Sequence, residues 1–180
     1  GLTFWSELRE YSVEDETRQM LKTQSRLYER TSGVSVALRN GLISLLDQTF
    51  PDINKLLQPT YRNIRGHFKW VDFVKHFWHR DCVAGMSSNA FMAAYNRWCE
   101  KSGYRYSSVD AEKIRQYAKG TVATFPKSES TKVLIVQAVD SLNAVYDSLQ
   151  ILRDEMYRLA SCLPEFHVVM AMQGAGEITG

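Results

Sequence analysis

Cysteine is scarce in this chain, and the marks of a secreted or membrane protein are missing. The chain has three cysteines, Cys82, Cys99 and Cys162, a small and odd number that does not suit a disulfide framework. They favour a reducing, cytoplasmic setting. No apolar run approaches the roughly 18 residues of a membrane span, and the N-terminus does not resemble a signal peptide. With 44% hydrophobic and 23% charged residues, the chain has the composition of one ordinary globular domain without a membrane partner.

Sequence motifs for catalysis are also missing. The chain contains no Walker loop, no dinucleotide-binding fingerprint and no G-x-S-x-G nucleophile elbow. Carboxylate pairs occur at Glu14 and Glu16 and at Asp154 and Glu155, but both pairs lie in charged helical stretches that suit a solvated face. We therefore predict no catalytic residue in this chain and leave open whether the whole protein is an enzyme.

Proline and glycine are absent from residues 128–163, the stretch that organises the chain. Its apolar residues recur in steps of three and four, which predicts a long helix with a stripe close to the coiled-coil period. Ser128 or Ser130 can cap its start, and Pro164 ends it. Because the stripe exceeds what one helix can cover, we expect part of it to bind a second copy of the chain. The residues assigned to this oligomer contact are Ile135, Val139, Leu142, Leu149 and Met156.

A second helical pattern, residues 13–50, matches the first in length, and Pro51 ends it. Apolar residues repeat every seven positions along this pattern. They are Val13, Met20, Leu27 and Val34, and the stripe is widened by Leu21, Tyr28, Leu38, Leu42, Leu45 and Leu46. The matching inner positions Thr17, Gln24 and Thr31 are polar, so this stripe is weaker than that of residues 128–163. We predict an all-α fold in which residues 13–50 and 128–163 form a long antiparallel hairpin resembling a coiled coil. Residues 1–12 are interpreted as a lead-in from a preceding domain.

Residues 51–127 form an insertion of short helices between the two long ones. Ser87 or Ser88 and Ser107 or Ser108 are candidate helix caps. No run alternates convincingly with period two, and residues 122–125 are the only weak strand candidate. After Pro164, residues 164–180 give a short apolar helix and a G-x-G turn. This layout is that of the start of a helix-hairpin-helix motif, whose amides can approach a phosphate backbone.

Positive charge is concentrated in the insertion. Residues 51–127 carry 13 Lys and Arg against 6 Asp and Glu, whereas residues 1–50 have a net charge of −1 and residues 128–180 of −4. Such an excess is typical of a nucleic-acid contact, although a solvated basic face explains it equally well. Cations and aromatic rings alternate in TYRNIRGHFKW and KSGYRYSS, where they could bind phosphates and unpaired bases. We assign nucleic-acid binding to Arg62, Arg65, Lys69, Lys101, Arg105, Gly174 and Gly176.

His76, His79 and Cys82 offer zinc-compatible donors at the spacing H-x2-H-x2-C. No CxxC pair supports them, so ordinary core or surface histidines are the better interpretation. We therefore predict neither a metal site nor a cofactor in this chain.

Four segments in order resemble the Piv-invertase family of insertion-sequence transposases: LREYSVEDETRQMLK, LRNGLISLLDQTFPDINKLL, FKWVDFVKHFWHRDC and LPEFHVVMAMQGAGEITG. The resemblance implies a preceding RuvC-like nuclease domain that binds magnesium through four acidic residues. It also implies a C-terminal domain with a nucleophilic serine, and recombination guided by a structured RNA. Neither catalytic motif matches residues of this chain, and Gln173 stands where the family often has proline before Gly174.

We therefore expect this chain to be a piece of a longer protein, between the two catalytic domains. The resemblance implies a dimerising scaffold that contacts the DNA ends of the element and its RNA in the cytoplasm. The alternative is a purely structural helical interaction module whose basic face is only solvated. Binding of a structured RNA at two salt concentrations distinguishes the two.

Overall fold

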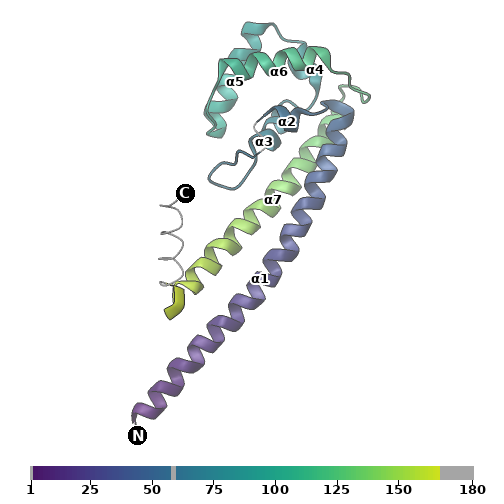
Figure 1. Cartoon of the computed structure of the whole chain (residues 1–180). Helices are drawn as coiled ribbons and strands as arrows, with labels where there is room; N and C mark the ends of the chain where they lie inside the picture. The colour runs from purple at the N-terminus through teal and green to yellow at the C-terminus, as the bar shows by residue number, and fades with distance from the viewer. Residues whose placement is uncertain (1, 58–59, 167–180) are drawn as a thin grey trace. The chain divides into compact units, whose positions relative to one another are not determined.

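The computed structural model describes residues 2–57 and 60–166 and confirms the predicted all-α fold (Figure 1). Within these residues the only β-type pairing is an isolated antiparallel bridge between Arg62 and Phe68. Residues 122–125, the weak strand candidate, form no strand. None of the described helices combines the length and the apolar character that crossing a membrane requires.

Two long helices, α1 (Leu2–Thr49) and α7 (Glu129–Ala160), have ends close to those predicted near Pro51, Ser128 and Pro164. The Ser128 hydroxyl caps α7, because its Oγ accepts a hydrogen bond from the Thr131 amide at 3.2 Å. The start of α1 differs from the prediction, because residues 2–12 continue the helix and do not form a separate lead-in. No proline or glycine lies between residues 2 and 32 to interrupt it.

The chain divides into two compact units, and both long helices run through both of them. The arm unit comprises Gly1–Gly33 and Ser148–Gly180, and the central unit comprises Val34–Asp147. This division differs from the predicted one into hairpin and insertion. The reason is that residues 34–49 of α1 and 129–147 of α7 share a core with the small helices.

In the arm unit, α1 and α7 pair antiparallel. Arg18 bonds to Glu165 at 3.1 Å, and a guanidinium nitrogen of Arg153 donates to the Tyr28 hydroxyl at 3.1 Å. Glu165 follows the C-terminal end of α7, so residue numbers that rise along α1 meet numbers that fall along α7 and the residues just after it. These contacts are exposed to solvent, and exposed pairs of this kind add little stability.

The predicted seven-residue stripe of α1 does not face α7 in the arm unit. Val13, Met20 and Leu27 are exposed by 58%, 51% and 51%, whereas Leu21 and Tyr28 are only partly exposed. Leu21 and Tyr28, which widen the predicted stripe, therefore lie on the inward face, whereas its seven-residue repeat is displaced from that face by one residue. A shift of one position turns a helix by about 100°, so the apolar stripe lies on the flank of α1.

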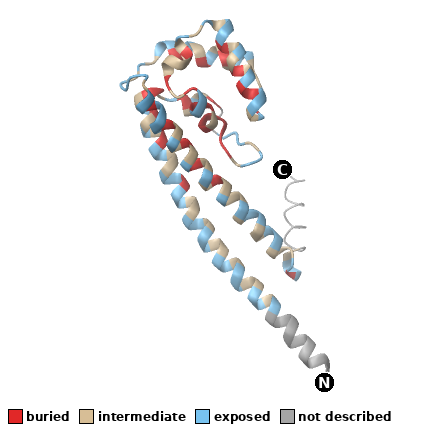
Figure 2. Ribbon diagram, turned by 180° about the vertical axis from the view of Figure 1, so that it is seen from behind, coloured by how far each residue is buried: buried red, intermediate tan, exposed pale blue. Residues whose placement is uncertain are grey.

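The central unit holds nearly all of the buried side chains (Figure 2). Apart from Leu163, every buried residue within 13–57 and 60–166 lies between Ser35 and Tyr146. The small helices of this unit are α2 (Ile53–Leu56), α3 (Lys69–His76), α4 (Arg80–Ala84), α5 (Ser88–Ser102) and α6 (Ser108–Gly120). Fully buried aliphatic and aromatic side chains from the long and the short helices form the core. They include Leu42, Leu46, Phe73, Phe91, Tyr95, Ile114 and Val139.

Side-chain caps position α5 and α6 as predicted. The Ser87 and Ser107 hydroxyls accept hydrogen bonds from the amides of Ala90 and Asp110, each at 3.2 Å. Gly103 ends α5 with φ of 73°, a left-handed conformation that glycine adopts without strain. The sequence interpretation missed α4, which has only one turn and follows a histidine cap.

Ile135, Val139 and Leu142, which the sequence assigned to an oligomer contact, do not lie on the surface of the central unit. Their side chains are exposed by 1%, 0% and 0%, because they already pack inside the central unit of one chain. Leu149 and Met156, in the arm unit, are partly exposed, and their assignment to an oligomer contact stays a prediction. The premise that one chain cannot cover the stripe of α7 overlooked the aromatic rings that the small helices supply, such as Phe68 at 5.6 Å from the ring of Tyr146.

Candidate nucleic-acid interface

The five predicted basic residues within the described chain lie in three separate places of the central unit. Arg62 and Arg65 flank a tight loop, Lys69 and Arg105 meet at a polar cavity, and Lys101 lines a third region. The two predicted glycines, Gly174 and Gly176, lie outside the described residues. The predicted basic residues therefore do not gather at a single site.

Arg62 and Arg65 are engaged with the chain's own groups. The guanidinium of Arg62 lies 4.1 Å from the ring centroid of Phe68 and 5.3 Å from that of Tyr146. Arg65 donates to Asp147 at 3.3 Å, although its side chain remains largely exposed. Cation–π and ion-pair contacts occupy these cations, so they are less available to phosphates than predicted.

The loop between these arginines is fixed by hydrogen bonds. The Asn63 side-chain oxygen accepts from the amides of Arg65 and His67 at 2.9 and 3.1 Å, and Gly66 takes the left-handed φ of 79°. The buried His67 then bonds through Nε2 to Asp147 at 2.7 Å. The loop is therefore joined to α7 through Asp147.

Lys69 is not the exposed phosphate contact that the sequence predicts. Its side chain is only 2% exposed, and its ammonium donates to the Arg105 carbonyl at 3.1 Å. The Arg105 side chain, by contrast, is exposed. Both residues line a polar cavity that shares no lining residue with the region around Lys101.

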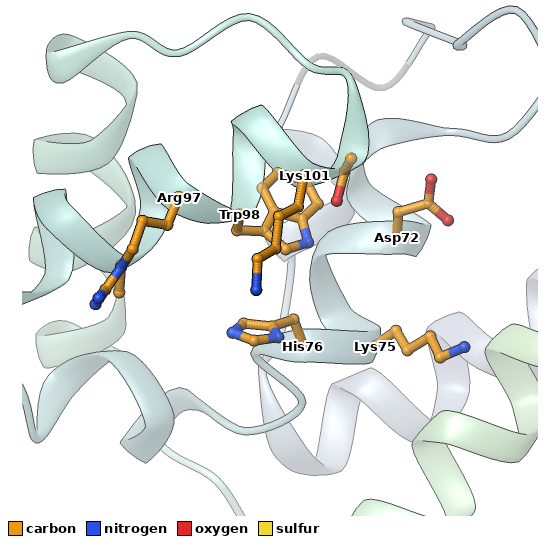
Figure 3. A pocket seen from close by; sticks show the side chains of 8 residues that line it. Asp72, Lys75, His76, Arg97, Trp98 and Lys101 are labelled. Carbon is orange, nitrogen blue, oxygen red and sulfur yellow. The ribbon is translucent and has the colours of Figure 1, made fainter.

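Lys101 lies at a basic pocket of about 680 Å³ between α3 and α5 (Figure 3). Side chains from both helices point into this space. Its lining comprises Asp72, Lys75, His76, Ala94, Arg97, Trp98, Lys101 and Ser102. We call this set the basic pocket.

Arg97 and Lys101 are the uncompensated charges of the basic pocket. They lie one turn apart on α5, and within the described residues neither side chain has a hydrogen-bond or ion-pair partner. Lys75 differs, because its ammonium pairs with Asp140 at 2.7 Å. Two free cations on one helix face give the pocket a net positive potential.

The acidic residue of the basic pocket accepts internal hydrogen bonds. Asp72 accepts from Asn143 at 2.8 Å and also from the Tyr104 hydroxyl. Burial, and then this bond to Asp72, raise the pKa of Tyr104, so the phenol stays protonated and keeps donating. Asp72 is thus held by donors on its own chain.

His76 responds to the same positive field. Burial lowers its pKa, and the charge of Lys101 lowers it further. The imidazole therefore favours its neutral form in the free protein. An anion in the pocket would favour the protonated form and add a third positive charge.

Trp98 forms an apolar wall of the pocket and is not a free stacking platform. It is 7% exposed, and its ring stacks on those of Tyr104 and Tyr95 at centroid distances of 5.2 and 5.8 Å. The basic pocket therefore suits a phosphate better than an inserted base.

Comparison of the chain with protein-family models, with curated proteins and with solved structures finds no match. The interpretation of the interface accordingly depends on its own geometry and on the sequence resemblance.

The weak metal candidates do not converge. Within the described residues no group of three or more His, Cys, Asp or Glu side chains could hold a metal ion. His79 accepts from the Asp81 amide at Nδ1 and donates from Nε2 to the Phe125 carbonyl at 2.9 Å, so both of its nitrogens are used. His76 packs edge-on against Phe77. Burial raises the pKa of the Cys82 thiol, which disfavours the thiolate that a metal needs.

The sequence interpretation missed Arg97, Lys75 and His76 as members of a basic site. A signal was available, because Arg97 and Lys101 are spaced i, i+4 on a helix and must share one face. The pairing of Lys75 with Asp140, 65 residues away along the chain, had no local signal.

Proposed function

We propose that this chain is a helical scaffold that binds nucleic acid through the basic pocket of its central unit. The observation that carries the proposal is the unpaired couple of Arg97 and Lys101 beside His76. Like charges at i, i+4 destabilise a helix by roughly 0.2–0.5 kcal/mol, a cost that a bound phosphate would remove. The surplus of positive charge in residues 51–127 supports the same partner.

We further propose that the scaffold belongs to a DNA recombinase of the insertion-sequence transposase type. The support is the sequence resemblance, whose segments before residue 83 form parts of α1, α2, α3 and α4. The partners are then the DNA ends of the element and a structured RNA. Catalytic groups and magnesium belong to other domains in this proposal.

Self-association is the third part of the proposal, and we assign it to the flank of α1. Val13, Met20 and Leu27 expose about half of their side chains at seven-residue intervals. A second copy offers the same stripe, and a seven-residue repeat allows two identical helices to pack along each other. A second copy of this chain is therefore the proposed occupant.

A purely structural interaction module is the second candidate function. The observation in its favour is that Arg62 and Arg65 satisfy groups of their own chain. In this case the positive charge of the central unit has no specific partner.

Fluorescence anisotropy with a labelled structured RNA and a labelled DNA duplex tests the proposal. We expect the wild type to bind at about 50 mM salt and to bind far more weakly at about 200 mM, because phosphate contacts release counterions. A variant with Arg97→Gln and Lys101→Gln should bind more weakly at the lower concentration. A wild type that binds neither probe at low salt would favour the structural module.

A further inference from the structure

A second polar cavity of the central unit, of about 720 Å³, is distinct from the basic pocket. Its volume falls within the roughly 300–1,000 Å³ of small-molecule sites. The residues that line it are Tyr61, Lys69, Arg105, Tyr106, Ser107, Ser108 and Asp110. None of them lines the basic pocket.

Lys69 is a buried cation without a counter-ion. It is 2% exposed, and within the described residues no carboxylate forms an ion pair with it. Its ammonium has three hydrogens, of which one is donated to the Arg105 carbonyl, and it lies 5.5 Å from the ring centroid of Tyr95. A buried charge is costly unless it is paired, so an anion in the cavity that Lys69 lines would stabilise its ammonium.

Further donors surround the same cavity. The exposed guanidinium of Arg105 has no partner within the described residues, and α6 begins at this cavity with Ser108. The first amides of a helix lack internal acceptors and carry partial positive charge. An ammonium, a guanidinium and helix amides together are the donor set of a phosphate group.

The remaining lining residues indicate what accompanies the phosphate. Tyr61 and Tyr106 supply aromatic surface, and aromatic side chains of this kind stack on unpaired bases. Asp110 is the only carboxylate of the lining, and within the described residues its side chain has no partner. A carboxylate repels a second anionic group but accepts hydrogen bonds from a sugar hydroxyl or a base amine.

We propose that this cavity binds one unpaired nucleotide, with its phosphate on Lys69 and Arg105 and its base against the tyrosines. Asp110 accepts a hydrogen bond from the base or the sugar. The inference deepens the proposed function and rests on it, because the nucleotide is one residue of a bound strand.

The ligands for the test are uridine 5′-monophosphate and adenosine 5′-monophosphate, titrated into the whole chain and followed by calorimetry at constant ionic strength. The corresponding nucleosides and inorganic phosphate serve as comparisons. We expect at least one of the nucleotides to bind with a dissociation constant below about 1 mM and more tightly than its nucleoside and than inorganic phosphate. Equal binding of nucleotide and inorganic phosphate, or no binding of either nucleotide, would overturn the inference.

Lys69→Met removes the buried charge and keeps the length of the side chain. We expect a loss of nucleotide affinity of at least about tenfold, because hydrogen bonds to charged groups contribute roughly 1.5–3 kcal/mol. The melting temperature without ligand should stay equal or rise, since an unpaired buried charge is replaced by an apolar group. A Lys69→Met protein that folds and binds the nucleotide as the wild type does would refute the assignment.

Arg105→Gln provides a second variant at an exposed position that folding does not depend on. It should also lower nucleotide affinity by about tenfold, for the same reason. Lys113→Gln, which removes one exposed charge from α6 outside this cavity, is the matched control and should change little. Equal effects of Arg105→Gln and Lys113→Gln would show a diffuse field and no site. If nucleotide binding fails while long RNA or DNA still binds, only this inference is lost and the proposed function stands.

Discussion

Leu142→Ala tests whether the stripe of α7 is the core of one chain or an interface between chains. Leu142 is fully buried in the central unit. Truncating a buried leucine removes its transfer free energy and leaves a cavity, at a cost of about 2–5 kcal/mol. For a protein of this size, each kcal/mol lowers the melting temperature by roughly 2–4 °C. We therefore expect the unfolding transition of the central unit to fall by about 4–20 °C.

Protein concentration distinguishes the two origins of this loss. Circular dichroism melts at two protein concentrations a hundredfold apart should give the same decrease, because a core within one chain does not depend on association. Val109→Ala removes an apolar side chain that is 62% exposed on α6, and this control should shift stability by no more than about 0.5 kcal/mol. A decrease for Leu142→Ala that grows at low protein concentration would restore the oligomer contact that the structure contradicts.

The remaining predictions concern the basic pocket, the flank of α1 and the loop held by His79. Lys101→Gln should raise the pKa of His76, seen in an NMR titration of the imidazole, because it removes a nearby positive charge. In the wild type the folded state holds the pKa of His76 below its ordinary value of 6.5, so on acidification the unfolded state binds the proton first and the stability falls as the pH drops below 6.5. Lys101→Gln should reduce this loss of stability. An unchanged pKa of His76 in the variant would contradict the assigned cause. Leu27→Glu should shift sedimentation toward monomer and make the melting temperature independent of protein concentration, whereas a wild type that is monomeric at tens of micromolar would refute the α1 contact. His79→Ala should cost about 2–4 kcal/mol in chemical denaturation, because it opens a cavity and leaves the Phe125 carbonyl without its donor; a loss below about 0.5 kcal/mol would contradict the role of this bond.

Most helix boundaries follow from local chemistry and were predictable. Ser87, Ser107 and Ser128 each bond to an amide three residues ahead, and Gly103 adopts the left-handed conformation that ends α5. Caps act over three or four residues, so the sequence alone contains the information. The five-residue helix α4 was not predicted, because a single turn of helix leaves no periodic pattern in the sequence.

The inward face of α1 was harder to predict, because its competing stripes differ little in hydrophobicity. Val13, Met20 and Leu27 repeat more regularly than the residues that face α7, where Thr17 and Gln24 are polar. Tertiary contacts such as the bond of Arg153 to Tyr28 decide between the two faces. Periodicity identifies a helix and its apolar stripe, but a stripe that faces solvent has the same period as one that faces the core, so the period alone does not show which stripe is buried.

The candidate site could be predicted only in its composition. The excess of Lys and Arg in residues 51–127 indicated where basic residues gather, but not which of them are free. Arg65 meets Asp147, 82 residues away along the chain, and Lys69 enters the core. Such pairings depend on the fold, so a search for interleaved cations and rings selects buried and engaged residues together with available ones.

The salt dependence of nucleic-acid binding is the most direct test of the central claim. The logarithm of the association constant should fall linearly with the logarithm of salt concentration, with a slope of roughly 0.7–0.9 for each phosphate contact. Arg97→Gln with Lys101→Gln removes two contacts and should reduce this slope by about 1.4–1.8. Lys113→Gln with Lys132→Gln changes the net charge equally at exposed positions outside the basic pocket and should leave the slope nearly unchanged. A reduction of the same size in both double variants would contradict a localised phosphate site at Arg97 and Lys101.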